Sequence, residues 1–235
     1  MKVLLFLHGW GCDKTVYANL VEKLTPRYNV ILPELPGFGD TPEPLTPWGV
    51  SDYADYIVQY LQERELNPDV MLCHSLGCRI AIKLLASGRL TPTKTVFTGA
   101  AGIRPVASTS QKFKTRMFKA KKALLKPFPK VLEKMRQKYG SADYRNATPI
   151  MRQCLVKIVN EDLTPLLPQV KSEVLLVWGE NDDSTPLSDG QTMERLMPDA
   201  GLAVIKSAGH YAFLEQPDTF GRILDSYLGG HSGNA

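Results

Sequence analysis

The sequence predicts an α/β fold built on an open, doubly wound sheet of about six parallel strands. Short runs rich in Val, Ile and Leu recur without polar alternation, which is typical of strands buried on both faces. Amphipathic helical patterns lie between these runs, and strand–helix alternation at this spacing implies right-handed βαβ units. The predicted strands are Val3–Leu7, Tyr28–Leu32, Val70–Cys73, Thr95–Thr98, Val174–Trp178 and Leu202–Ile205.

Four helical patterns accompany these strands. Their apolar residues recur every three or four positions, which places them on one face of a helix. Gly88 is expected to end the third helix, and Pro217 is expected to open the last one. The apolar faces consist of Val16, Leu20 and Leu24; Tyr53, Ile57, Tyr60 and Leu61; Leu76, Ile80, Ala81, Leu84 and Leu85; and Phe220, Ile223, Leu224 and Tyr227.

The alternation breaks once, after the fourth predicted strand. The next 65 or so residues keep only helical periodicity, with helices expected near Phe113 and Val131 and a third that opens at Thr148-Pro149. A chain of 235 residues is long enough for one large core that carries such an insertion. The expected boundaries are 1–103 and 169–235 for the core and 104–168 for the helical insertion.

Charge is unevenly distributed along the chain. The formal net charge is only +4, but residues 104–157 contain 15 basic and two acidic residues, a net charge of +13, while the rest carries −9. Three interpretations of this basic stretch stay open: a solvated helix face, a docking surface for an acidic partner such as an acyl carrier protein, and adsorption to an anionic membrane. Nucleic-acid binding fits the charge but no recognisable motif, so no nucleic-acid partner is expected.

Cysteine spacing and hydropathy bear on the compartment. The four cysteines show no CxxC pair or regular framework, which favours a reducing, cytoplasmic location. No stretch approaches the roughly 18 apolar residues of a membrane span, and the apolar run after Lys2 is too short for a signal peptide. No metal-ligand spacing is present, and neither a metal nor a cofactor is expected.

Ser75 is the candidate nucleophile. It follows the third predicted strand and leads directly into a helical pattern, and ligands of an open parallel sheet bind at the carboxyl ends of the strands. A serine on a sharp strand-to-helix turn has an exposed hydroxyl, and the small Gly77 lets strand and helix approach closely. The alternative is that Ser75 is an ordinary helix N-cap.

Two further strand ends supply the partners that a nucleophilic serine needs. His210 follows the sixth strand and can act as a base, because the unperturbed pKa of histidine lies near 6.5. Asp182 follows the fifth strand and can fix the tautomer of that histidine. Asp183 is the alternative carboxylate. The three groups occur in the order Ser, Asp, His, each after a different strand.

The first predicted strand ends in His8-Gly9-Trp10-Gly11. A glycine-rich turn beside the nucleophile can supply a backbone N–H that joins that of Leu76 in an oxyanion hole. His8 is interpreted as a structural residue that packs this turn. His74 is expected to point into the surroundings of its own turn.

These motifs together resemble the α/β-hydrolase superfamily over nearly the whole chain. The resemblance implies Ser75 as nucleophile, Asp182 as acid and His210 as base. It also implies an oxyanion hole formed by the Trp10 and Leu76 amides, and a cap domain formed by the insertion. The motifs that carry it are His8-Gly9-Trp10-Gly11, Leu35-Pro36-Gly37-Phe38-Gly39, His74-Ser75-Leu76-Gly77, Trp178-Gly179-Glu180-Asn181-Asp182 and Gly209-His210.

The chain departs from the family pattern in two respects. Cys73 stands where the motif around the nucleophile usually begins with Gly, and Cys78 stands where Gly or Ala is common. We expect the turn to tolerate both, with a slightly altered fit of strand to helix. Family members usually carry two strands before the first motif, which here begins at His8, so a sheet of six strands, all parallel, is expected.

The resemblance also narrows the function. A serine at this turn is similar to esterases, thioesterases, peptidases, lipases and carbon–carbon bond hydrolases, and argues against relatives that use aspartate there. The first two motifs resemble the pimeloyl-carrier-protein methyl esterases of biotin synthesis. We expect a serine hydrolase that cleaves a carboxylic ester of a small acyl substrate through an acyl-enzyme. The alternatives are a thioesterase or acyl-carrier-protein ester hydrolase that docks through the basic insertion, and a non-catalytic protein that binds a small ligand.

Overall fold

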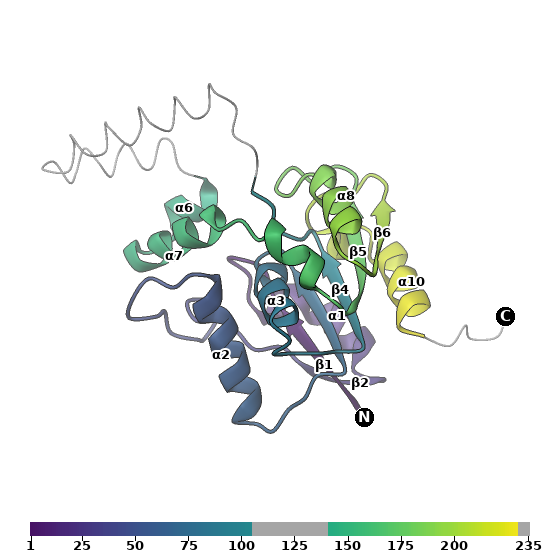
Figure 1. The fold of residues 1–235 in the computed structure, drawn as a ribbon, viewed down its shortest axis with the longest axis horizontal. Coiled ribbons are helices and arrows are strands. Elements are labelled where there is room, and N and C mark those ends of the chain that lie inside the picture. The colour runs from purple at the N-terminus through teal and green to yellow at the C-terminus, as the bar shows by residue number, and fades with distance from the viewer. Residues whose placement is uncertain (105–140, 230–235) are drawn as a thin grey trace, which may run out of the picture.

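The computed structural model describes residues 1–104 and 141–229. Its centre is a sheet of six parallel strands in the order β2-β1-β3-β4-β5-β6 (Figure 1). The predicted open parallel sheet is confirmed, and each strand end lies within about two residues of its predicted position. The strands are β1 (Lys2–Leu7), β2 (Tyr28–Ile31), β3 (Val70–His74), β4 (Lys94–Thr98), β5 (Glu173–Gly179) and β6 (Ala200–Ile205).

Helices cover both faces of the sheet, as a doubly wound fold requires. In Figure 1, α2, α3 and α8 lie in front of the sheet and α1 lies behind it. The described helices are η1 (Lys14–Tyr17), α1 (Ala18–Leu24), α2 (Val50–Gln62), α3 (Leu76–Ala86), α6 (Ala142–Asn146), α7 (Pro149–Asn160), η2 (Thr164–Gln169), α8 (Leu187–Leu196), α9 (Ala212–Glu215) and α10 (Pro217–Leu228).

The central strand β1 shows why its sequence is apolar without interruption. Leu5 and Leu7 pack into the hydrophobic cluster under α2, α3 and α8, whereas Leu4 and Phe6 pack into the cluster under α1 and α10. All four side chains are fully buried. Because successive side chains of a strand point to opposite faces, a strand covered on both sides needs apolar residues at every position.

The chain reverses its direction across the sheet next to β1. From β1 the chain passes first to β2 on one side and then back to β3 on the other, where Leu7 lies opposite Cys73. In open α/β sheets this switch point leaves a crevice at the carboxyl ends of the two strands, and ligands bind there. The turns that follow β1 and β3 therefore meet at the functional edge of the fold.

The edge strand β6 is less buried than a uniformly apolar run suggests. Ile205 is its only buried residue, since the strand has a neighbour on one side alone. It begins at Ala200 rather than at Leu202 because Ala200 and Gly201 also pair with β5. Neither of these small residues carries a strand signal in the sequence.

The insertion between β4 and β5 is described from residue 141 onward. The predicted start of α7 is observed, with the Thr148 side chain accepting a hydrogen bond from the Met151 amide and Pro149 in the first turn. Met151, Cys154 and Ile158 of α7 join the main hydrophobic cluster. The helices expected near Phe113 and Val131, and the chain end from residue 230, lie outside the described residues.

We expect Gly77→Ala to destabilise the protein by about 3 kcal/mol or more, because a Cβ at Gly77 would overlap the backbone carbonyl of Leu7 at the end of β1. The matched control is Gly221→Ala in α10, where nothing lies within 4 Å of the added Cβ. That change should raise stability by about 0.5–1 kcal/mol. Urea denaturation measures both, and equal effects of the two substitutions would contradict the close approach.

Candidate active site

Ser75 occupies a strained turn between β3 and α3. Its backbone has φ 49° and ψ −107°, a conformation that non-glycine residues rarely adopt. Hydrogen bonds on both sides hold it there: the Ser75 amide donates to the Thr98 carbonyl at 3.2 Å, and the Cys78 amide donates to the Ser75 carbonyl at 3.1 Å. Ser75 precedes α3, but its hydroxyl makes no capping hydrogen bond, so the N-cap interpretation does not account for it.

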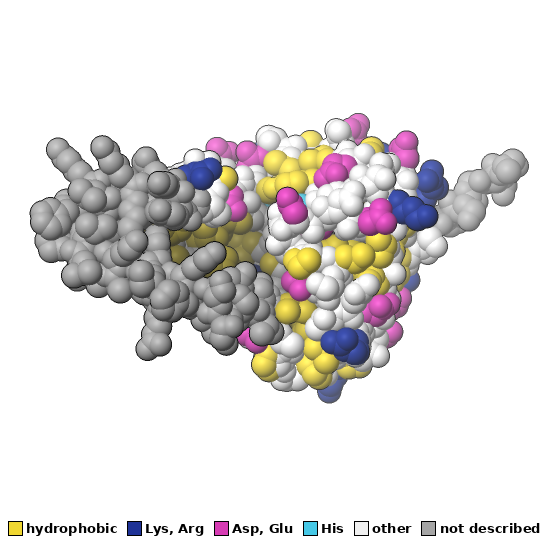
Figure 2. Space-filling view, turned by 90° about the horizontal axis from the view of Figure 1, so that it is seen from above, with side chains coloured by type: hydrophobic (Ala, Val, Ile, Leu, Met, Phe, Trp, Pro, Cys, Tyr) yellow, Lys and Arg dark blue, Asp and Glu magenta, His cyan; other side chains and the backbone are white. Residues whose placement is uncertain are grey.

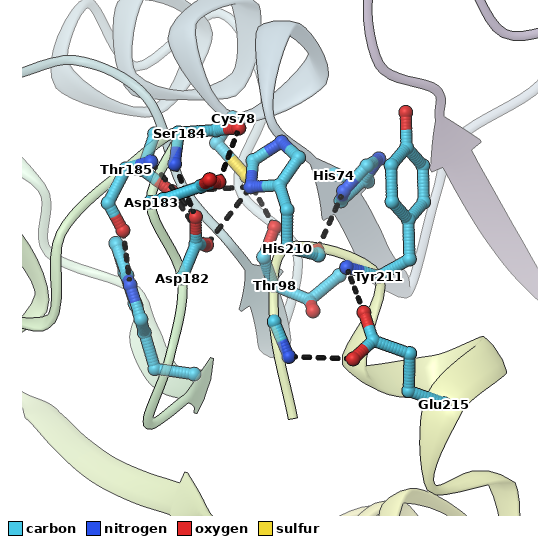
Figure 3. Close-up of polar contacts among 12 residues, drawn as sticks. His74, Cys78, Thr98, Asp182, Asp183, Ser184, Thr185, His210, Tyr211 and Glu215 are labelled. Carbon is cyan, nitrogen blue, oxygen red and sulfur yellow. Dashed lines mark hydrogen bonds and ion pairs between the residues drawn. The ribbon is translucent and has the colours of Figure 1, made fainter. Parts of the chain in front are cut away.

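Asp182 and His210 form a sheltered pair at the ends of β5 and β6. Figure 3 shows the two side chains turned toward each other, and His210 Nδ1 lies 2.8 Å from Asp182 Oδ2. The Asp182 carboxylate also accepts hydrogen bonds from the Ser184 amide and from the amide and hydroxyl of Thr185, each at 2.9 Å. Burial acts to raise the pKa of Asp182, but the hydrogen bonds from His210 and Thr185 outweigh it and leave this pKa below its ordinary value.

This geometry defines how the histidine is protonated. An ionised carboxylate only accepts hydrogen bonds, so His210 Nδ1 carries the hydrogen and Nε2 is left as the basic nitrogen. Asp183, the alternative carboxylate, is exposed, and its contact is a 3.4 Å hydrogen bond from the Ser184 hydroxyl. Of the two adjacent acids, it is Asp182 that contacts His210.

Ser75 and His210 line one cavity of about 450 Å³. Within the described ranges no hydrogen bond joins the Ser75 hydroxyl to His210, whose ring contacts Asp182 instead. Trp10 and Leu76 line the same cavity, and neither of their amides donates to an acceptor in the described part of the chain. Leu76 is the first residue of α3, where amides lack a helical partner.

Comparison with known proteins assigns the chain to a family. A family model described as the alpha/beta hydrolase family matches residues 4–223. The chain belongs to the alpha/beta hydrolase family. The family resemblance predicted from the motifs is thereby confirmed.

This alpha/beta hydrolase is also similar to individual curated proteins. It is 26% identical to the pimeloyl-acyl-carrier-protein methyl ester esterase of Aliivibrio fischeri over 247 residues, covering 97% of this chain and 94% of the relative. The enzyme of the same name from Nitrosomonas europaea is 26% identical over 242 residues, with coverage of 95% and 94%. The narrower resemblance drawn from the first two motifs is borne out as a similarity.

Solved structures agree on the fold. An esterase from Exiguobacterium antarcticum superposes with a TM-score of 0.75 at 23% identity, covering 97% of this chain and 92% of that one. At 23% identity, this superposition shows that the two chains share a fold.

A chain of hydrogen bonds through His74 links the segments that follow β1 and β6 to the end of β3. The Gly9 amide donates to the Tyr17 hydroxyl at 2.9 Å, and that hydroxyl lies 2.9 Å from His74 Nδ1. His74 Nε2 lies 3.2 Å from the backbone carbonyl of His210 (Figure 3). A carbonyl only accepts, so Nε2 carries the hydrogen and the Tyr17 hydroxyl donates to Nδ1. Tyr17 is part of this network although the sequence analysis did not single it out.

The buried ring of His8 holds the glycine-rich turn after β1 through two hydrogen bonds. Its Nε2 accepts a hydrogen bond from the Leu35 amide at 2.9 Å, so its Nδ1 donates to the Gly9 carbonyl at 2.8 Å. Burial lowers the pKa of His8, which keeps the ring neutral. Gly9 itself must be glycine, since a Cβ would lie 2.7 Å from His74 Nδ1, and Gly11 has φ +70°.

Cys73 and Cys78 fill the small space behind the Ser75 turn. Both thiols are fully buried, and the Cys78 thiol donates to the Cys73 carbonyl at 3.1 Å. Burial raises the pKa of each thiol, so both stay protonated and inert. The larger side chains at these two positions are thus accommodated inside the core.

The described residues contain neither a cluster placed to bind a metal ion nor a helix that could span a membrane. Among residues 1–104 and 141–229, no group of three His, Cys, Asp or Glu side chains is placed to hold a metal ion. No helix in the same ranges is long and apolar enough to cross a membrane.

We expect Tyr17→Phe to lower the free energy of unfolding by about 2–4 kcal/mol, because it leaves the Gly9 amide and His74 Nδ1 buried without partners. Tyr28→Phe is the matched control, since Tyr28 is also buried but its hydroxyl makes no hydrogen bond to a described residue. Urea denaturation of both variants measures the difference. Equal losses would show that the Tyr17 hydroxyl carries no special role.

His74 should make the protein sensitive to mild acid. Burial lowers its folded pKa to about 3, whereas an unfolded histidine titrates near 6.5. Its contribution to stability is therefore complete above about pH 6.5 and is lost as the pH falls toward 3, at up to about 1.4 kcal/mol per pH unit. In urea titrations between pH 7 and 4, His74→Gln should show a shallower slope than the wild type. An unchanged slope would contradict this origin.

Proposed function

We propose that this alpha/beta hydrolase cleaves carboxylic esters as a carboxylesterase-type serine hydrolase, with Ser75 as nucleophile, His210 as base and Asp182 as the acid. The observation that carries the proposal is the contact of buried Asp182 with His210, 2.8 Å apart, since His210 lines the same cavity as the strained Ser75. The names of its curated relatives support ester hydrolysis as the reaction class.

The proposed reaction proceeds through an acyl-enzyme. His210 Nε2 removes the proton of the Ser75 hydroxyl, whose oxygen attacks the acyl carbonyl, and the amides of Trp10 and Leu76 donate to the oxyanion. As the tetrahedral species collapses, His210 gives its proton to the leaving alcohol. Water then attacks the acyl-enzyme with the same base and releases the acid. Asp182 stays ionised and stabilises the imidazolium in both halves.

We propose that the insertion, residues 104–168, acts as a cap over this site. Leu155, Ile158 and Val159 of α7 line the cavity together with Ser75. The core would then comprise residues 1–103 and 169–235. An apolar wall contributed by the cap suits an acyl chain, and residues of the cap would set the size of the substrate.

A carrier-protein ester is the second candidate for the substrate. The curated relatives act by name on esters of an acyl carrier protein, and residues 104–157 carry a net charge of +13 against −9 elsewhere. On the described surface seen in Figure 2, acidic side chains are scattered among hydrophobic ones and no basic patch gathers. Docking of an acidic carrier would therefore use the basic stretch, most of which lies outside the described residues.

The cytoplasm is the proposed location, since the four cysteines are unpaired and buried.

We expect Ser75→Ala to reduce ester turnover by ~10⁴-fold or more, because members of such a triad act as a unit. Hydrolysis of p-nitrophenyl acetate and butyrate measures it, and a fluorophosphonate probe should label the wild type but not the variant. Retained turnover in Ser75→Ala would refute the assignment. A folded wild type that the probe does not label would favour a non-catalytic binding protein.

The adjacent acids supply a matched control for the same assay. Asp182→Asn should cost roughly 10⁴-fold in turnover, because the amide favours the wrong tautomer of His210. Asp183→Asn should stay within about threefold of the wild type, since Asp183 makes no contact with the histidine. The reverse ranking would move the role of acid to Asp183.

A further inference from the structure

Arg79 is a buried cation in the wall of the cavity that holds Ser75. It lies in the first half of α3, four residues after Ser75, and its side chain is only 6% exposed. Helical side chains lean toward the N-terminus of their helix, and the N-terminus of α3 is the end next to Ser75. Arg79 therefore projects toward the same end of α3 as the nucleophile.

The guanidinium has fewer partners than a buried charge normally has. Arg79 Nη1 donates one hydrogen bond, to the backbone carbonyl of Glu161 at 2.8 Å. In the described part of the chain no carboxylate lies within 4 Å of it, and the Glu161 carboxylate pairs with Lys83 instead. A guanidinium carries five N–H donors, so most of them have no described acceptor. Burial lowers the pKa of Arg79, which reflects the cost of keeping this charge out of water.

The position of Arg79 in its helix adds to this cost. The N-terminal end of α3 carries the partial positive charge of the helix dipole, which disfavours a cation in the first turns. For an arginine that only fills space, this position near the N-terminus of α3 offers no favourable electrostatic interaction. An anion in the cavity, in contrast, would be attracted by the guanidinium and by the helix end together.

We propose that Arg79 binds a carboxylate on the acyl part of the substrate, so that the preferred substrates are monoesters of dicarboxylic acids. The inference rests on the proposed ester hydrolysis and names its substrate class. Leu155, Ile158 and Val159 give the same cavity an apolar wall, which suits a chain of methylene groups between the carboxylate and the ester. The reaction adds water to the ester and releases an alcohol and the dicarboxylic acid.

Asp189 of α8 should weaken the binding of a substrate carboxylate. Its substitution is therefore expected to change the substrate preference in the opposite direction to substitution of Arg79. Asp189 lines the same cavity, and burial raises its pKa, although Arg79 acts in the other direction. When ionised, it repels a substrate carboxylate. Replacing it by a neutral amide should strengthen the preference for anionic substrates, whereas removing Arg79 should abolish that preference.

A purely structural role is the competing explanation. Through the Glu161 carbonyl, Arg79 ties the end of α7 to α3, and loss of this link could disturb the cavity for every substrate. Structural disturbance lowers the turnover of charged and neutral esters alike. Loss of a carboxylate contact lowers the turnover of the charged ester alone.

The experiment compares kcat/KM for matched pairs of methyl esters. Each monomethyl ester of succinic to pimelic acid is paired with a neutral isostere in which an isopropyl group replaces the carboxylate, such as methyl 6-methylheptanoate for monomethyl adipate. The wild type should favour the charged member at one chain length or more by about 10-fold or better. Arg79→Met should erase this ratio, Asp189→Asn should increase it, and the exposed Arg64→Met should leave it unchanged.

Two results would overturn the inference. One is a wild type that shows no preference for the charged ester at any chain length. The other is an Arg79→Met variant in which kcat/KM falls equally for the charged ester and for its neutral partner. Calorimetry of monomethyl adipate binding to Ser75→Ala distinguishes a failure of this inference from a failure of the proposed ester hydrolysis. The ester should bind Ser75→Ala at least 10-fold more tightly than it binds the Ser75→Ala, Arg79→Met double variant, whether or not Ser75 is the nucleophile.

Discussion

The hydrogen-bond chain from Gly9 through Tyr17 and His74 to the His210 carbonyl holds the site together. Gly9 and Tyr17 follow β1, His74 ends β3 and His210 follows β6, so its members are far apart in sequence. The two links to the Tyr17 hydroxyl are buried and the third is partly buried, so breaking one of the first two would leave polar groups without partners in a medium that cannot replace them. The strained conformation of Ser75 persists because the surrounding loops are fixed in this way.

Much of the fold is readable from the sequence because parallel strands covered on both faces must be apolar throughout. That rule located all six strands, and the rule that ligands gather at strand ends directed attention to Ser75, Asp182 and His210. The spacing alone left Asp182 and Asp183 as alternatives. Only the folded turn shows that one carboxylate points to His210 while its neighbour points to solvent.

The features that the sequence did not reveal depend on packing between distant segments. Helix α8 has only Gly190 and Met193 buried, too few apolar positions to register as a helical stripe. Gly190 is needed because a Cβ would lie 2.8 Å from the Trp178 ring. Arg79 carries no functional signal in the sequence, and its surroundings come from distant segments: the Glu161 carbonyl at the end of α7 accepts its hydrogen bond, and Asp189 of α8 lines the same cavity.

The alkylation rates of the four buried thiols would report how the folded protein opens. Cys73 in β3 and Cys78 in α3 are fully buried and would react with an alkylating reagent only when the core itself opens. Cys154 lies on α7, where its sulfur accepts a hydrogen bond from the Trp48 amide across the boundary between insertion and core. Its alkylation would follow a smaller movement, the separation of α7 from the core. The rates at these sites would thus distinguish local opening above the cavity from global unfolding.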